Sequence, residues 1–160
     1  MTDKTIGEYD TITPTGTEKI EVETAASESK NVTIGDIVAL VSIPPIYIQF
    51  AASAEIGDLT AGTNVVTFRA PRALTVTEVR ASLTTASTSG GVTFDINMNG
   101  ATMLSTKLTI DQDEKTSTTA AVSAVVSTPD MADDVEITVD IDAPGTGAAG
   151  AKITIIGTAA

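Results

Sequence analysis

The sequence predicts a mainly β protein: an antiparallel jelly-roll-like β-sandwich, preceded by a small N-terminal β-hairpin and a short helix. Three observations support this prediction. From Tyr47 onward, short runs of Thr, Val and Ile are separated by Gly, Pro, Asn and Asp at intervals of roughly ten residues, a spacing typical of sandwiches and barrels. Several runs alternate apolar and polar residues, as half-buried strands do. No long helical period interrupts them.

Length and composition indicate how the chain is organised. Its 160 residues and 16.3 kDa correspond to one domain with an N-terminal appendage of a few tens of residues. We therefore divide it into residues 1–45, a separate N-terminal element, and residues 46–160, the sandwich. Hydrophobic residues make up 42% but aromatic residues only 3%, so Val, Ile, Leu and Ala must build the core. Such a core is thin, and we expect partner subunits to complete it.

The N-terminal element begins with an arm and a hairpin. Residues 1–14 are polar and have no sustained period, which predicts an extended arm that needs a partner to become ordered. Apolar and charged residues then alternate in residues 19–23, and residues 32–34 repeat the pattern. These two segments predict paired strands, with residues 25–30 as the polar connection.

A short helix is predicted after the hairpin. Asp36 can cap the apolar run of residues 37–41, because an Asp side chain accepts hydrogen bonds from the first N–H groups of a helix. Pro44-Pro45 ends that helix after little more than one turn. Hairpin and helix together are too small to fold alone, but they can attach to a larger assembly.

The second part of the chain contains eight predicted strands, which are residues 47–50, 64–70, 74–83, 92–97, 103–110, 119–126, 135–141 and 151–156. In residues 92–98 and 135–142, apolar side chains fall on one face and polar side chains on the other. We expect the first face to be core and the second to be solvent.

Two local signals refine these strands. The apolar phase of residues 74–83 slips by one near Thr77-Glu78, which predicts a β-bulge or bend. Asn99-Gly100 predicts a tight hairpin because both residues tolerate positive φ. Residues 144–147 open a second connection before the final strand. The same strands could also form an up-and-down barrel, which is the alternative architecture.

Charge and composition exclude several classes of function. Nine basic and 21 acidic residues give a net charge of -12 and a pI near 4.1, so phosphate backbones repel the chain and we expect no nucleic-acid partner. The chain has no Cys and no His, which removes thiolate and imidazole chemistry. The longest apolar stretch, residues 37–50, spans about 14 residues and is broken by Pro44-Pro45, whereas a membrane span needs roughly 20. Residues 1–4 do not start a secretory signal.

One acidic segment resembles the start of a calcium loop. Asp111, Asp113 and Glu114 are closely spaced, but an EF-hand loop would require Gly where Thr116 stands and Glu where Val122 stands. The segment therefore predicts a solvated turn, with a metal site as the weaker alternative.

A second acidic group lies near the C-terminus. Asp133-Asp134, Asp140 and Asp142 could bind a cation or act as paired carboxylates in sugar hydrolysis, which needs two carboxyl groups at a defined separation around a cleft. No sequence feature indicates such a cleft, and a solvent-facing strand is the better interpretation. We predict no catalytic, cofactor-binding or metal-binding residues, and we expect that the protein is not an enzyme.

Arginines and tyrosines provide the remaining binding candidates. Arg69, Arg72 and Arg80 all lie near one early hairpin of the sandwich, where they could pair with carboxylates of a neighbouring subunit or of their own chain. Sugar binding usually uses an aromatic platform, but the chain has no Trp, and Tyr9 and Tyr47 lie at or before the edge of the sandwich.

Two parts of the chain resemble virion proteins of tailed bacteriophages. Residues 15–20 with 32–37 look like an N-terminal element that recurs in head fibres and tail-associated proteins. The second resemblance is to a β-sandwich module common in phage structural proteins, and it rests on residues 58–63, 66–71, 79–86, 104–110 and 132–138. The family implies a non-enzymatic and often trimeric protein of the phage head or tail. Unlike many relatives, this chain has only the Pro44-Pro45 elbow between the two parts.

The resemblance implies a virion structural protein of the capsid-decoration or head-fibre type. We expect it to form a homotrimer on the virion surface, bound to the major capsid protein or another virion protein. The alternative is a short tail fibre or spike that recognises a glycan on the host-cell surface. Neither hypothesis includes a membrane partner. The apolar residues expected to anchor the N-terminal element to the virion are Ile20, Val22, Val32, Ile34, Ile37, Val38 and Leu40.

Overall fold

A computed structural model of the protein describes residues 19–23, 29–33 and 44–160. The chain divides into two compact units, Met1–Ile43 and Pro44–Ala160. Each unit is described by itself. Among the described residues, no helix has the length and apolar character needed to cross a membrane.

The first unit contains an antiparallel hairpin of β1 (Lys19–Glu23) and β2 (Ser29–Thr33). Its register pairs Ile20 with Val32, so these two positions share one face of the ladder with Val22. The second strand starts at Ser29, inside the segment predicted as a connection. Backbone pairing with Glu23 extends it there, although residues 29–31 lack apolar alternation. The predicted short helix falls in residues 34–43, outside the described residues.

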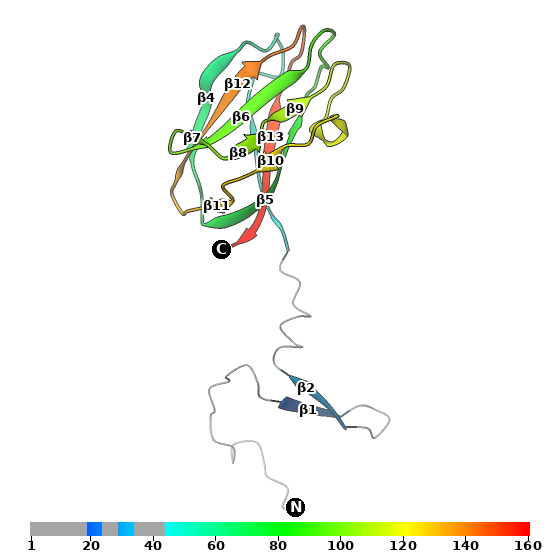
Figure 1. Ribbon diagram of the computed structural model, residues 1–160, viewed down its shortest axis with the longest axis vertical. Helices are drawn as coiled ribbons and strands as arrows, with labels where there is room; N and C mark the ends of the chain where they lie inside the picture. The colour runs from blue at the N-terminus through cyan, green and yellow to red at the C-terminus, as the bar shows by residue number, and fades with distance from the viewer. Residues whose placement is uncertain (1–18, 24–28, 34–43) are drawn as a thin grey trace, which may run out of the picture. The chain divides into compact units, whose positions relative to one another are not determined.

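The second unit is an antiparallel sandwich of two main sheets (Figure 1). The first sheet contains, in spatial order, β11 (Asp130–Met131), β5 (Leu74–Ser82), β13 (Lys152–Ala159) and β3 (Ile46–Ala51). The second contains β4 (Gly62–Arg69), β12 (Glu136–Ala143), β6 (Val92–Met98) and β7 (Ala101–Thr102), with β9 (Leu108–Ile110) also paired to β6. A separate pair joins β8 (Leu104–Thr106) to β10 (Val125–Val126).

The strand order identifies the type of sandwich. In the first sheet the first strand of the unit, β3, lies beside the last, β13; in the second sheet β4 lies beside the next to last, β12. This nesting of early strands against late ones produces the orders β3-β13-β5-β11 and β4-β12-β6-β9, which are those of a jelly roll. The predicted fold class is therefore confirmed, and the barrel alternative is wrong.

The predicted bulge lies in β5. Ile156 pairs with Glu78 and Gly157 with Val76, so Thr77 is the extra residue. The inward phase changes there, because side chains before and after Thr77 must both reach the core. A Cβ on Gly157 would lie 2.6 Å from the carbonyl oxygen of Thr75. Glycine at position 157 lets the two backbones approach closely at the bulge.

The predicted hairpin at Asn99-Gly100 is also confirmed. It joins β6 to β7 through a two-residue turn, with Met98 paired to Ala101. Asn99 has φ of 48° and Gly100 has φ of 78°, and two consecutive positive values are the signature of a type I′ turn.

Two predicted strands differ from the structure. Residues 103–110 form two short strands, β8 and β9, because β8 pairs with β10 whereas β9 pairs with β6. Of residues 119–126, only Val125–Val126 are in a strand. A 3-10 helix, η1 (Ser117–Thr119), precedes them, and the Thr116 side chain caps it by accepting from the N–H of Thr118.

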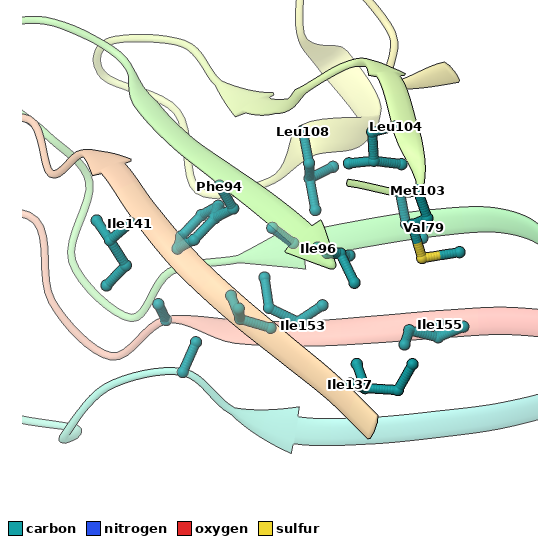
Figure 2. Close-up of a cluster of buried hydrophobic side chains, with 14 of the residues drawn as sticks. Val79, Phe94, Ile96, Met103, Leu104, Leu108, Ile137, Ile141, Ile153 and Ile155 are labelled. Atoms are coloured by element: carbon teal, nitrogen blue, oxygen red, sulfur yellow. The ribbon is translucent and has the colours of Figure 1, made fainter. Parts of the chain in front are cut away.

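The core lies between the two sheets (Figure 2). Its largest fully buried side chains come from both sheets and from the segments beside them: Phe94, Leu74, Ile96, Met103, Leu108, Ile110, Met131, Ile137, Ile153, Ile155, Val92 and Val139. Phe94 is the one aromatic residue of this set. Burying each such side chain contributes about 1.5–3 kcal/mol, so aliphatic side chains supply most of the stabilisation, as the composition predicted.

The two ends of the sandwich differ in what they carry. The chain enters the first sheet at Ile46, which pairs with Gly157 near the end of the last strand. The turn at residues 70–73 lies at this same end, because Leu74, which follows it, pairs with Ala159. The turns at residues 99–100 and 132–135 lie beside it, since Ala70 exchanges hydrogen bonds with Val135 and Asp134, and Asn99 donates to Glu136. Four further connecting segments meet at the opposite end, which we call the loop end (Figure 1).

Candidate functional site

The loop end of the sandwich brings four loop segments together in one surface. It is formed by residues 52–61, 83–91, 111–116 and 144–151. Backbone hydrogen bonds join the four segments: Leu59 N–H donates to Ala148 O (2.7 Å), Thr84 N–H to Ala149 O (2.9 Å) and Asp113 N–H to Ser87 O (2.8 Å). These bonds connect loops that are far apart in sequence, so the loop end forms one continuous and well-supported surface.

Ser87 lies at the centre of this network. It is 1% exposed, and its hydroxyl accepts from the N–H of Thr146 (2.9 Å) and donates to the carbonyl of Ser89 (2.9 Å). Gly145 has φ of 65°, and a Cβ there would lie 2.4 Å from Ser87 Oγ. Glycine is needed at that position both for the positive φ and for the close approach. The hydroxyl of Ser87 is thus used in holding two loops together.

A charged contact joins two of the same loops. Lys152 Nζ lies 2.7 Å from Glu55 Oε2 and 3.3 Å from Thr84 Oγ1, and the Thr84 hydroxyl donates to the other oxygen of Glu55. The hydrogen bond from Lys152, followed by the one from Thr84, lowers the pKa of the Glu55 carboxyl. The pair is exposed to water, so its role is to orient the loops more than to stabilise the fold.

A shallow hollow of about 270 Å³ lies beside the loop end, where the β3–β4 connection meets the second sheet. Its lining consists of small and apolar residues with a single carboxylate: Ala52, Ser53, Ala54, Ile56, Gly57, Asp58, Leu59, Thr60, Val65 and Ile141. One ionisable group provides no acid–base pair, and the hollow offers apolar contacts from Ile56, Leu59 and Val65 beside the hydroxyls of Ser53 and Thr60.

A second polar network covers the outer face of the second sheet. Lys107, between β8 and β9, reaches Asp142 (2.6 Å) and Asp95 (3.1 Å). Asp95 also accepts from the Thr102 hydroxyl. The hydrogen bond to Asp142, followed by the one to Asp95, raises the pKa of Lys107. The single ammonium group therefore links three segments of this face.

This network corrects one expectation. The outward residues of the central strands were predicted to face solvent, yet Asp95 is 6%, Asn97 9% and Thr138 5% exposed. They are shielded because neighbouring polar side chains close over them: Asn97 donates to Asp140 (3.1 Å), whose other oxygen accepts from the N–H of Asn64 (2.7 Å). Among the described residues, no buried polar side-chain atom lacks a partner.

The acidic segments take part in backbone and side-chain contacts. Asp111 accepts from the N–H of Ala121 (2.8 Å), and Glu114 accepts from the Thr119 hydroxyl. Asp134 adopts φ of 58° in the turn before β12. In the part of the chain that the structure describes, no three acidic residues are grouped so that they could hold a metal ion.

Two of the three arginines pair within the chain. Arg69 lies 3.4 Å from Glu136 and donates to the carbonyl of Asp134. Arg80 forms two hydrogen bonds with Glu78 (2.6 and 3.0 Å), which raise the pKa of its guanidinium. Of the two pairings considered from the sequence, the structure contains the intramolecular one.

The predicted anchoring residues fall into two groups. Ile20, Val22 and Val32 lie in the β1–β2 hairpin, where the register brings their positions to one face. The other four, Ile34, Ile37, Val38 and Leu40, lie outside the described residues. The role assigned to all seven stays a prediction.

Sequence reasoning missed the Lys107 network and the Ser87 junction. The signal for the first was weak: a lysine interrupts an apolar and Thr-rich run opposite outward acidic residues of two other strands. The two loops that Ser87 joins to its own, through Asp113 and Thr146, lie more than twenty residues away, so no local pattern could reveal them.

Comparison with known proteins gave no relative: no protein-family model, no curated protein and no solved structure matches the chain.

Proposed function

We propose that the protein is a phage virion structural protein of the capsid-decoration or head-fibre type. Residues 1–45 anchor it to the major capsid protein or another virion protein, and residues 46–160 stand on the particle surface as an acidic jelly roll. The observation that supports this best is that the two ends of the sandwich differ. The chain enters it at one end, and the four interlinked loops lie at the other. A molecule held by its N-terminal segment would therefore present the loop end to the surroundings.

The N-terminal hairpin supports an anchoring role. An isolated two-stranded hairpin is marginally stable in water and needs a further strand or a packing partner. With five residues per strand, β1 and β2 have too little surface to bury alone. A virion protein that adds a strand or an apolar groove would supply the missing contacts.

Composition and fold are compatible with display on a shell. A net charge of -12 keeps neighbouring surface proteins soluble and apart, and jelly rolls occur in viral capsid proteins as well as in lectins. Fold alone does not fix function, so the proposal rests on the resemblance to phage virion proteins and on the difference between the two ends of the sandwich. Trimerisation is part of it, because the aromatic-poor core gains from cover by neighbouring subunits.

The alternative function is host recognition by a short tail fibre or spike. The hydrogen-bonded loops of the loop end favour it, since binding residues are often placed on loops held by a rigid scaffold. The four segments contain no aromatic residue, which weakens the case for a glycan platform. Hundreds of copies spread over the head would support decoration, and a few at the tail would support recognition.

The anchor can be tested by adding purified protein to particles produced without it. We expect the full chain to bind, and the Ile20→Asp, Val32→Asp variant to lose at least tenfold in affinity, because both changes place charges on one face of the hairpin. Glu21→Gln, at a position on the other face, is the matched control. Normal decoration by the double variant, counted from particle images, would overturn the anchoring role of this hairpin.

A further inference from the structure

One side of the sandwich exposes apolar residues, where β3 and β4 are the outermost strands of their sheets. We call it the β3–β4 edge. The described residues include five exposed large hydrophobic side chains. Val65 (38% exposed), on β4, and Ile56 (89%), in the β3–β4 connection, line the same hollow, whereas Tyr47 (62%) points outward from β3 in the other sheet. Isolated exposed apolar residues are normal on a protein surface, but neighbouring ones such as Ile56 and Val65 mark an interaction site.

The core is also left partly open beneath these residues. The inward side chains of the two strands are half-buried, whereas those of the central strands are buried: Ile46, Ile48, Phe50, Val66 and Phe68. The rings of Phe50 and Phe68 lie 4.8 Å apart across the gap between the sheets. Apolar area that could still be removed from water remains on this side, and each Å² covered contributes about 25 cal/mol.

The backbone of this edge is available for pairing as well. In the described part of the chain, β3 pairs with β13 alone and β4 with β12 alone. Natural proteins usually protect such strands with charges, prolines or bulges. β3 carries no charged residue, whereas β4 carries Arg69 at its far end and a register shift opposite Val139 and Ile141. Left uncovered, β3 would template uncontrolled strand pairing.

Charge indicates what covers the edge. The chain bears 21 acidic residues against nine basic ones, so two copies repel each other over most of their surface. Neither β3 nor β4 contains an Asp or Glu, so the two strands add no repulsion between copies. Of the acidic residues in their connection, Glu55 is paired with Lys152 and Asp58 lines the hollow. The hollow lined by Ile56 and Val65 lies on the same side and can receive an apolar side chain.

We propose that the β3–β4 edge is the subunit interface of this protein, and that a second copy of the chain covers it. Edges of neighbouring copies meet about a common axis, where they bury Ile56 and Val65 and complete the open part of the core. This inference rests on the oligomeric part of the proposed function. It assigns that interface to named strands and is independent of how the hairpin binds particles.

The full chain provides a direct test by sedimentation equilibrium. We expect wild-type protein to sediment as an oligomer at about 50 µM, and the Ile56→Lys, Val65→Lys variant to sediment as a single chain, with association weakened at least tenfold, because buried unpaired charges oppose contact. Both side chains are exposed, so far-UV circular dichroism should be unchanged. The matched control is Val122→Lys, Val125→Lys, which alters the other two exposed apolar residues and should leave the mass unchanged.

Three results would overturn the interface. The first is an oligomer that persists in the Ile56→Lys, Val65→Lys variant. The second is equal dissociation of the control variant. The third is a wild-type chain that stays single at about 50 µM, which would also remove the trimer from the proposed function. Particle binding tests the anchoring role separately. That role is overturned if the Ile20→Asp, Val32→Asp variant binds particles normally, whatever molecular mass sedimentation gives.

Discussion

The gap between the two sheets is covered on one side of the sandwich and left open on the other. On the side of β6 and β5, the gap between the sheets is closed by β11, η1 and the β8–β10 pair. Met103, Leu104, Leu108 and Met131 are all at most 4% exposed there. At the β3–β4 edge no described segment covers the gap, and the inward side chains of both strands are half-buried.

The difference teaches where this small domain obtains its stability. A chain of this size with few aromatic residues has limited apolar area to bury. About forty residues between β6 and β12 cover one side of the gap between the sheets. The other side is left for contacts outside the domain. Stability should therefore depend mainly on the closed side and association on the open side.

The largest predicted effect compares one aliphatic truncation on each side. Leu108→Ala should reduce the free energy of unfolding by about 2–4 kcal/mol, because Leu108 is 1% exposed and its loss leaves a cavity. Ile48→Ala should cost about 1 kcal/mol, because Ile48 already touches water. Urea denaturation in the Ile56→Lys, Val65→Lys background measures both without a contribution from association. Equal losses would show that the two sides are equally closed.

A smaller effect is expected from the Lys107 network on the closed side. Lys107→Met leaves the Asp95 carboxylate, with 9% of its side chain exposed, without a counter-charge, and should cost about 1–2 kcal/mol in urea denaturation. Adding Asp95→Asn should recover part of this loss, because the buried charge is then removed. Lys115→Met, at an exposed lysine, is the control and should be neutral. The raised pKa of Lys107 means that its contribution is complete at neutral pH and lost only as pH rises through that value.

The smallest effect concerns the loop that leaves the open side. The pKa of Glu55 is lowered, so its contact with Lys152 contributes above the ordinary pKa of a glutamate and is lost as pH falls through the lowered value. Lys152→Met should move the Glu55 pKa back towards its ordinary value, measured by carboxyl-carbon NMR titration. Lys115→Met should not move it. An unchanged Glu55 titration in the Lys152 variant would show that the contact is absent in solution.

Much of the fold was predictable because local rules operate within single strands. The phase slip near Thr77 located the bulge, and Asn99-Gly100 located a hairpin, since each signal is contained in a few adjacent residues. Residues 103–110 were predicted as one strand because their pattern is continuous. The break at Lys107 depends on two different partner strands, β10 and β6, which no local pattern reports.

The open side of the sandwich could be predicted from the sequence only in part. The lack of any charge in residues 46–51 can be read from the sequence, but whether β3 lies at the edge or the centre of a sheet depends on strand order. The same limit applies to the outer face of the second sheet. Asp95 alternates with core residues as an exposed residue would, yet Lys107 and Thr102 cover it.

The position of the two ends of the sandwich has a practical consequence. Pro44 leads into β3 beside the final residues of β13, while the exposed tip at residues 88–90 lies at the loop end. A peptide inserted at this tip would lie at the end opposite Pro44, whereas one fused after Ala160 would lie at the same end as Pro44. Both chain ends of the jelly roll therefore lie at one end of the sandwich, and the exposed tip that can accept an insertion lies at the other.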